Sequence, residues 1–230
     1  MPDQLTSLVL PVYNQADHID GIVEGYLAAV RRVGNPLEVL VVTNGCTDRS
    51  IEVCETLAER HEPVRHIGLT PPGWGRAVRA GLREARGERL IYTNSARTTP
   101  EMLSLMLSYA RAYPDIVLKA NRKIRDSWHR RLGSLLYNLE CRALFDLPTW
   151  DINGTPKVFP RALSRLMELE RDDDLIDVEF AMVCRREGYP VVEVPILATV
   201  RHGGRSTTNY RSALRMYRGA LELRRTARLR

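Results

Sequence analysis

With 230 residues, of which 44% are hydrophobic and 27% charged, the chain has the composition of one ordinary globular domain and can bury a substantial core. These values exclude a chain dominated by disorder, and no apolar run reaches the eighteen or so residues that predict a membrane-spanning helix. The net charge of +6 is uneven, because residues 201–230 hold nine arginines and one glutamate. A basic end of this kind indicates an anionic partner: a phosphate, a lipid headgroup or a nucleic acid.

Cysteine usage and the N-terminus indicate the compartment. The four cysteines show neither C-x-x-C pairing nor metal-like spacing, so we expect them to pack as small hydrophobic residues in a reducing environment. The first residues lack the basic and apolar regions of a signal peptide. We therefore expect a cytoplasmic protein, either soluble or peripheral at the inner face of the membrane.

The first half of the chain alternates short apolar runs with helical patterns. The predicted strands are residues 7–13, 37–42, 64–68 and 90–93, and the predicted helices are residues 18–33, 51–58 and 77–85. Such alternation is typical of parallel strands joined by right-handed crossovers. The pattern therefore predicts an α/β fold with a mostly parallel sheet.

Beyond Pro100 the pattern becomes less regular. The segments expected here are a helix at 100–113, a strand at 115–120, a helix from Trp128, a helix from Arg161, an acidic turn at 172–174, a helix at 175–187, a strand at 191–200 and a last helix from Tyr210. We expect residues 1–206 to form the domain and residues 207–230 a basic amphipathic C-terminal helix that is either part of the same domain or membrane-associated.

Two of these predicted helices are amphipathic and basic. The first carries Trp128, Leu132, Leu135 and Leu139 on one stripe, and the last carries Tyr210, Leu214, Tyr217 and Leu221 with arginines around them. The first helix can be interpreted either as an ordinary core-facing helix or, like the last, as a helix that lies on an anionic membrane.

The end of the central strand at 90–93 carries unusual chemistry. Ligands of open α/β sheets collect at such strand ends, where carboxylates often hold a divalent cation. Here the positions are Asn94, Ser95, Ala96 and Arg97: an amide, a hydroxyl, a methyl and a guanidinium. We expect no metal at this spot.

Seven short segments in a fixed order resemble family 2 glycosyltransferases of the GT-A fold, in the branch of the dolichyl and polyprenyl phosphate mannosyltransferases. The segments are residues 11–14, 44–50, 73–77 with 81–82, 121–122, 151–159, 177–179 and 188–195. The resemblance covers Leu8 to about Ser206. It implies a three-layer, Rossmann-like sandwich and transfer of a sugar from a nucleotide-diphosphate donor with inversion.

Three acidic motifs of that family are neutral in this chain. Gln15 stands where the family usually has Glu, Asn44 where it has Asp, and the metal-binding D-x-D motif maps to residues 94–96. Either the enzyme is metal-independent and uses cationic side chains to neutralise the diphosphate, or the fold persists without catalysis. Asn94 can still hydrogen-bond a ribose, so neutrality is compatible with nucleotide binding.

The resemblance assigns the donor nucleotide to the first two strand ends, the glycine loop and the central strand end. The predicted nucleotide-binding residues are Pro11, Tyr13, Asn14, Gln15, Asn44, Gly75, Asn94 and Ser95.

Positive charge is required for the leaving diphosphate and for an acceptor phosphate. Arg97 is the predicted catalytic cation, one position beyond the lost motif. The predicted phosphate-binding residues are Arg76, Arg122, Arg131, Arg201, Arg205 and Ser206. The arginines of the tail can alternatively be a solvated surface.

Three acidic segments complete the predicted site. Asp177 stands where inverting relatives place the base for a hydroxyl acceptor and Glu179 where the polyprenyl branch has its glutamate, although either could only cap or orient. Asp151, with Gly154 and Thr155, is predicted at the sugar or acceptor, or as a turn former. The run 172–174 could replace the metal site, but we expect an exposed first turn of a helix.

The resulting prediction is an inverting glycosyltransferase that uses no metal cofactor, although a weak dependence on Mg²⁺ or Mn²⁺ stays open. Its acceptor is either a polyprenyl phosphate or a small-molecule hydroxyl. The alternatives are a non-catalytic nucleotide-sugar-binding protein and a nucleic-acid binder, and the latter lacks the aromatic-interleaved or helix-turn-helix signals it requires. The sequence does not indicate an oligomeric state.

Overall fold

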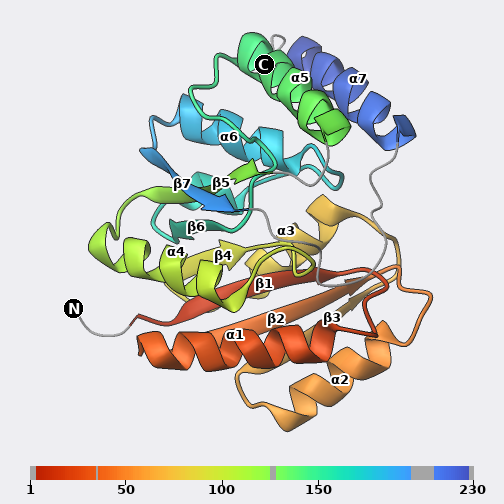
Figure 1. Cartoon of the computed structure of the whole chain (residues 1–230), viewed down its shortest axis with the longest axis vertical. Helices are drawn as coiled ribbons and strands as arrows, with labels where there is room; N and C mark the ends of the chain where they lie inside the picture. Colours follow the sequence, from red (N-terminus) through yellow and green to blue (C-terminus); the bar gives the residue numbers. More distant parts are fainter. Residues whose placement is uncertain (1–3, 35, 125–127, 198–209, 228–230) are drawn as a thin grey trace.

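The structure is a computed structural model that describes residues 4–34, 36–124, 128–197 and 210–227. Its described strands form one seven-stranded sheet in the order β3-β2-β1-β4-β6-β5-β7 (Figure 1). The strands are β1 (Thr6–Val12), β2 (Leu37–Asn44), β3 (Val64–Leu69), β4 (Arg89–Tyr92), β5 (Val117–Ile124), β6 (Lys157–Pro160) and β7 (Val191–Leu197). All pairs are parallel except those of β6, which runs antiparallel to both β4 and β5.

Helices cover both faces of this sheet, which gives the three layers expected for an α/β sandwich (Figure 1). The helical segments are α1 (Ile19–Val33), α2 (Ser50–Arg60), α3 (Trp74–Glu84), α4 (Pro100–Ala112), α5 (Trp128–Phe145), the 3₁₀ turn η1 (Ser164–Met167), α6 (Ile176–Arg186) and α7 (Tyr210–Ala227). Helices α1, α2 and α4 pack on one face, whereas α3, α6 and η1 pack on the other. Helices α5 and α7 lie side by side at one end of the molecule and pack against α6.

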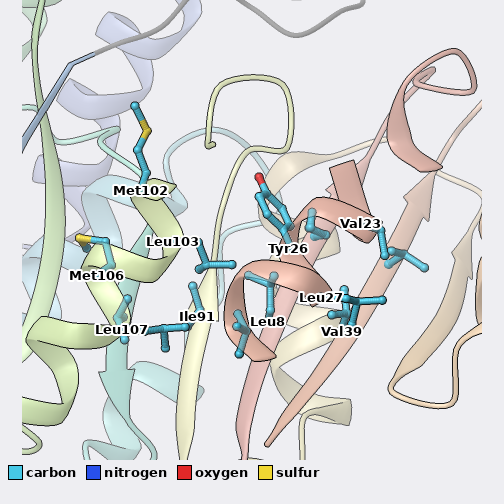
Figure 2. Packing of buried hydrophobic residues seen from close by; sticks show 14 of the residues in the cluster. Leu8, Val23, Tyr26, Leu27, Val39, Ile91, Met102, Leu103, Met106 and Leu107 are labelled. Carbon is cyan, nitrogen blue, oxygen red and sulfur yellow. The ribbon is translucent and has the colours of Figure 1, made fainter. Parts of the chain in front are cut away.

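Successive side chains of each strand point alternately to the two faces of the sheet, and the core on the α1 and α4 face shows this. Leu8 of β1 and Ile91 of β4 point from the sheet toward Leu103 of α4 and Tyr26 of α1 (Figure 2). Intervening residues such as Val9 point to the opposite face, where α3 and α6 cover them. Because both faces are buried, the strands are almost continuously apolar, as parallel strands of α/β proteins are.

The α/β class, the mostly parallel sheet and most predicted elements are confirmed. The helix expected from Arg161 is wrong, since only the four-residue turn η1 forms there. Farther along this segment, the amides of Glu170 and Arg171 donate to the carboxylate of Glu179 at 2.8 and 2.9 Å. These amides are therefore engaged by a side chain of α6 and not by helical carbonyls.

The structure contradicts one of the two interpretations of the leucine stripe on α5. Leu132, Leu135 and Leu139 are 44 to 47% exposed, whereas Tyr137 and Cys141 are buried against α6 and α7. The interpretation in which the leucine stripe faces the core is therefore wrong. On α7, Tyr217 packs toward α5 whereas Leu221 is exposed, so the predicted stripe of this helix is not one continuous contact.

Candidate functional site

Hydrogen bonds join the loops that follow β1 and β2. Asn14, in a left-handed conformation with φ 51°, donates from Nδ2 to Thr47 Oγ1 at 3.1 Å and accepts from Thr47 N at 2.8 Å. The amide of Gln15 donates to Ser50 Oγ at 2.7 Å. The amide of Ala16 donates to Asp48 at 3.2 Å. The two predicted nucleotide-binding loops are thus held together as one rigid edge.

Asn44 ends β2 and uses both halves of its amide. Its Nδ2 donates to the carbonyl of Val12 at 2.8 Å, and its Oδ1 accepts from the amide of Gly73 at 3.1 Å. The side chain is only 4% exposed. An aspartate could accept from Gly73, but its ionised carboxylate would face the Val12 carbonyl without a donor. The amide at this family-acidic position therefore fits the local geometry.

The turn after β4 is closed on itself and on β1. Ser95 Oγ donates to Gln15 Oε1, and both residues are buried. Asn94 Oδ1 accepts from the amide of Ala96 at 2.9 Å. Carboxylates at residues 15, 94 and 96, the acidic positions of the family, would repel one another without a cation, whereas the neutral side chains of this chain do not.

The turn after β4 carries no carboxylate, because its residues are Asn94, Ser95, Ala96 and Arg97. Among the described residues no group of three or more His, Cys, Asp or Glu side chains is arranged to hold a metal. The side-chain oxygens of Asn94 and Gln15 each accept a hydrogen bond from a protein donor. Arg97 lies on the same turn, half-buried, with its amide donating to the Asn94 carbonyl at 3.3 Å.

A second cluster lies at the end of β5. Asp151 Oδ2 accepts from the amide and from Nε of Arg122 at 2.9 and 2.7 Å, and Asp151 Oδ1 accepts from Nη2 at 2.6 Å. Burial opposes the charge of Arg122, but the attraction of Asp151 outweighs it and raises the pKa of the guanidinium. Gly154 packs so closely on β5 that a Cβ would lie 2.0 Å from the Ala120 carbonyl. Three predicted acceptor residues, Arg122, Asp151 and Gly154, are therefore brought together.

Asp177 is buried beside a buried lysine. Its Oδ1 accepts from Lys157 Nζ and, at 2.9 Å, from the hydroxyl of Tyr92. Lys157 Nζ also lies 5.1 Å from the ring centroid of Tyr92 and 5.6 Å from that of Phe180. Burial lowers the pKa of Lys157 although Asp177 acts in the opposite direction, and burial raises the pKa of Tyr92. One oxygen of the Asp177 carboxylate is thus engaged by two donors.

The acidic run before α6 packs against the start of α3. Asp172 accepts from Arg76 Nη2 at 3.0 Å and from Arg79. Partial burial acts in the opposite direction, but these two arginines lower the pKa of Asp172. A Cβ at Gly75 would lie 2.3 Å from the Arg171 carbonyl, so this glycine is needed for the contact. The expectation that residues 172–174 form an exposed first helical turn is wrong, because α6 begins at Ile176 and Asp172 pairs with α3.

Several predicted residues are placed only in part. Tyr13 is exposed, Pro11 is buried in β1, and Thr155, which follows Gly154, is buried. The side chain of Arg131, and all of Arg201, Arg205 and Ser206, lie outside the described residues. The sequence predictions missed Lys119, Lys157, Tyr92 and Glu193, although a lysine inside each of two otherwise apolar strand segments was the signal that could have found them.

The fold is the one that GT-A glycosyltransferases share. One similar solved structure is glucosyl-3-phosphoglycerate synthase from Mycobacterium tuberculosis in complex with Mn²⁺, UDP and phosphoglyceric acid, with a TM-score of 0.72 and 17% identity over 96% of this chain and 78% of that chain. Another is the mannosyltransferase PcManGT from Pyrobaculum calidifontis in complex with GDP-Man and Mn²⁺, with a TM-score of 0.55 and 22% identity over 93% of this chain and 60% of that one. At these identities the likeness concerns the fold.

The family model described as glycosyl transferase family 2 matches residues 7–167, and the chain belongs to this family. An undecaprenyl-phosphate 4-deoxy-4-formamido-L-arabinose transferase from Pectobacterium carotovorum is 34% identical over 143 residues, which is 59% of this chain and 42% of the relative. The transferase of the same name from Pseudomonas paraeruginosa is 27% identical over 169 residues, covering 72% of this chain and 50% of the relative. The chain thus spans half or less of the length of these relatives. The predicted family is confirmed, and no helix among the described residues has the length and apolarity for a membrane crossing.

Replacement of Asn44 by Asp tests the local fit of the amide. We expect N44D to destabilise the fold by about 1–3 kcal/mol at pH 7, because a buried carboxylate then faces the Val12 carbonyl without a donor. Protonation restores a donor, so the loss should shrink at pH 4.5. Urea unfolding at both pH values measures this, with N14D as the matched control at an exposed Asn–Thr pair. Equal stability of N44D and the wild type at pH 7 contradicts the role given to the amide.

Proposed function

We propose that the protein transfers a sugar from a nucleotide-diphosphate donor to the phosphate of a polyprenyl phosphate, with inversion and without a divalent cation. Family membership supports sugar transfer. The observation that carries the metal-independent form is the neutral edge of Gln15, Asn44, Asn94 and Ser95. In it the side-chain oxygens of Gln15, Asn44 and Asn94 accept from protein donors, and Ser95 is the donor to Gln15. The relatives named as undecaprenyl-phosphate sugar transferases support the acceptor.

On the donor side, the joined loops after β1 and β2 offer a preformed surface for the base and the ribose. The negative charge that develops on the leaving diphosphate requires a cation in a water-poor site. Arg97, on the turn after β4, supplies a guanidinium that matches two phosphate oxygens at once. The arginines near the C-terminus are proposed to add charge from the segment that resembles the family's loop over the diphosphate.

On the acceptor side, Arg122 binds the phosphate, and one of the phosphate oxygens attacks the anomeric carbon. The bond from that carbon to the acceptor oxygen forms on the face opposite to the bond that breaks, and the electron pair leaves with the nucleotide diphosphate. Because the attacking oxygen is already anionic, no side chain has to remove a proton. This fits the engagement of Asp177 by Lys157 and Tyr92, and of Glu179 by two backbone amides.

The rival function is nucleotide-sugar binding without catalysis. Isothermal titration with UDP-sugars and GDP-sugars, together with transfer assays on farnesyl phosphate and on hydroxyl acceptors, separates the two. Binding without transfer to any acceptor supports the rival.

The leucine stripe of α5 provides the second part of the proposal, contact with an anionic membrane. Leu132, Leu135, Leu136 and Leu139 are 44 to 51% exposed on one helix. They are followed by Arg142, whose guanidinium lies 4.2 Å from the ring centroid of the exposed Trp150. Exposed leucines bordered by a tryptophan and an arginine are typical of helices at a membrane interface.

Charge distinguishes a bilayer from a second copy of the chain as the occupant of this surface. The neighbouring helix α7 contributes exposed Arg218 and Arg225, and residues 201–230 carry a net excess of basic groups. Two such basic surfaces would repel each other, whereas anionic headgroups attract them. Asp151, which holds Arg122, follows Trp150, and Trp150 contacts Arg142 of α5, so the acceptor phosphate would lie next to the leaflet that holds its lipid tail.

Chelation tests metal independence. We expect transfer to farnesyl phosphate to retain more than about half of its rate in excess EDTA, since no side-chain set at the end of β4 suits a cation. Transfer from a radiolabelled donor measures the rate. Loss of activity in EDTA that manganese restores contradicts the proposal.

Replacement of Arg97 by Ala tests the cation. We expect R97A to lower kcat by about 10²–10³-fold, as removal of one transition-state donor does, while the free energy of unfolding changes by about 1 kcal/mol or less. R165A, which removes an exposed arginine paired with Glu168, is the control. An unchanged kcat in R97A removes Arg97 from the mechanism.

Polar substitutions on α5 test the membrane surface. We expect the double variant L135N/L139N to bind phosphatidylglycerol vesicles at least about tenfold more weakly, because two exposed leucines contribute apolar area to insertion. L105N, on an equally exposed leucine of α4, is the matched control for loss of one apolar group. Vesicle cosedimentation measures affinity. Unchanged binding, or a wild-type dimer in light scattering that the variant dissociates, contradicts the proposed occupant.

A further inference from the structure

A row of polar side chains crosses one face of the sheet next to the cluster of Arg122, Asp151 and Gly154. Strand register pairs Tyr92 of β4 with Lys157 of β6, and Lys157 with Lys119 of β5. The register also pairs Lys119 with Glu193 of β7. Paired residues of adjacent strands share one face of a sheet. Both lysine side chains are at most 1% exposed.

All of the hydrogen-bond donors of Lys119 are used by acceptors inside the protein. Its Nζ donates to Glu193 Oε1 at 2.7 Å, to the carbonyl of Asp151 at 2.9 Å, and to the carbonyl of Trp150. An ammonium has three N–H groups, so each has an acceptor. Burial lowers the pKa of Lys119 although Glu193 opposes this effect. An apolar residue would fill this position without the desolvation penalty, so the observed bonds need an explanation beyond packing.

The two carbonyls belong to a turn with an unfavourable backbone. Asp151 has φ 46°, in the left-handed region that non-glycine residues seldom adopt and that surrounding contacts must hold. Lys119 Nζ donates to the carbonyls of Trp150 and Asp151, which lie on either side of the N and Cα atoms of Asp151 in the backbone. Glu193 accepts from the amide of Trp150 at 3.0 Å, and the amide of Gly154 donates to the Asp151 carbonyl at 2.6 Å. Lys119 and Glu193 together therefore fix this turn to β5 and β7.

This turn also orients the Arg122 side chain. The Asp151 carboxylate holds Nε and one Nη2 hydrogen of the guanidinium and also the Arg122 amide. A guanidinium has five N–H groups, so three of them are not used by this carboxylate. The side chain of Arg122 is 19% exposed. Its orientation thus depends on Asp151, and the position of Asp151 depends on Lys119.

We propose that Lys119 is a positioning residue that sets the Asp151–Arg122 pair for the acceptor phosphate. This inference rests on the proposed function, because it assumes that Arg122 binds that phosphate. Without the ammonium, the two carbonyls lose their shared donor and the left-handed turn relaxes. The guanidinium then samples other orientations, and phosphate binding loses the benefit of preorganisation. The donor edge lies on β1, β2 and β4 and keeps its own hydrogen bonds.

A double-mutant cycle with farnesyl phosphate as the probe tests this dependence. Isothermal titration of the full chain gives the Kd for farnesyl phosphate in the wild type, K119M, R122Q and K119M/R122Q. We expect K119M to raise Kd at least about tenfold when Arg122 is present and less than about twofold when Arg122 is replaced, because Lys119 acts through Arg122. The Kd for the nucleotide-diphosphate donor should stay within about twofold of the wild type in K119M.

A control for lost stability is available at the opposite end of the strands. Glu38 is a buried carboxylate that accepts from Ser7, Arg65 and the amide of Arg86, so E38Q perturbs a buried polar cluster away from the site. Thermal unfolding identifies the loss of stability in both variants, and E38Q should leave Kd for farnesyl phosphate unchanged. If K119M does not fold, K119M/E193Q removes the ammonium together with the charge of its partner and takes its place in the cycle.

The outcomes separate this inference from the proposed function. An equal effect of K119M in both backgrounds, or no effect in either, overturns the positioning role. A wild-type protein that does not bind farnesyl phosphate contradicts the proposed acceptor and this inference with it. Binding that only Arg122 controls leaves the acceptor intact and overturns the role of Lys119 alone.

Discussion

The hydrogen bond from Ser95 to Gln15 links two of the strand ends that form the proposed nucleotide-binding edge of the sheet, at the ends of β1, β2 and β4. It joins the turn after β4 to the loop after β1, and Asn44 joins the end of β2 to the end of β1 and to the loop before α3. Gln15 and Asn44 stand at positions where family 2 relatives usually carry a carboxylate, and the bond from Asn44 Nδ2 to the Val12 carbonyl requires an amide. These groups bond one another or the backbone, so the ends of β1, β2 and β4 are joined by side-chain hydrogen bonds. In the proposed metal-independent reaction, side chains such as Arg97 supply the charge that a cation would otherwise provide.

The proposed acceptor end of the sheet differs from this neutral edge, since it buries charges in matched pairs. Lys119 pairs with Glu193, Lys157 with Asp177, and Arg122 with Asp151. Buried pairs seldom add much stability over apolar residues, but they fix geometry because an unpaired member is strongly disfavoured. In this protein the geometry concerned is a left-handed turn at Asp151 and the direction of one guanidinium. The antiparallel strand β6 makes the arrangement feasible, because it inserts Lys157 between β4 and β5.

Much of the fold could be predicted from the sequence, because strand and helix periods are local. The ranges of β1, β2, α4 and α6 follow directly from apolar spacing and turn residues. The buried face of α5 could not be predicted. Its leucines and the set Tyr137, Cys141 and Phe145 both recur at helical spacing, and only packing on α6 and α7 decides which set is buried. The candidate site was predictable as a set of strand ends. Its pairings were not, since Lys119 and Asp151 are brought together by strand register and by a turn, neither of which leaves a local pattern.

The central claim is that the nucleotide edge works without a divalent cation. It is tested most directly by electron paramagnetic resonance of Mn²⁺ titrated into the protein with and without a saturating nucleotide diphosphate. The account predicts that the protein adds no Mn²⁺ site beyond the binding that the free nucleotide shows. One tightly bound Mn²⁺ per chain whose signal changes in the variant N94A would contradict it.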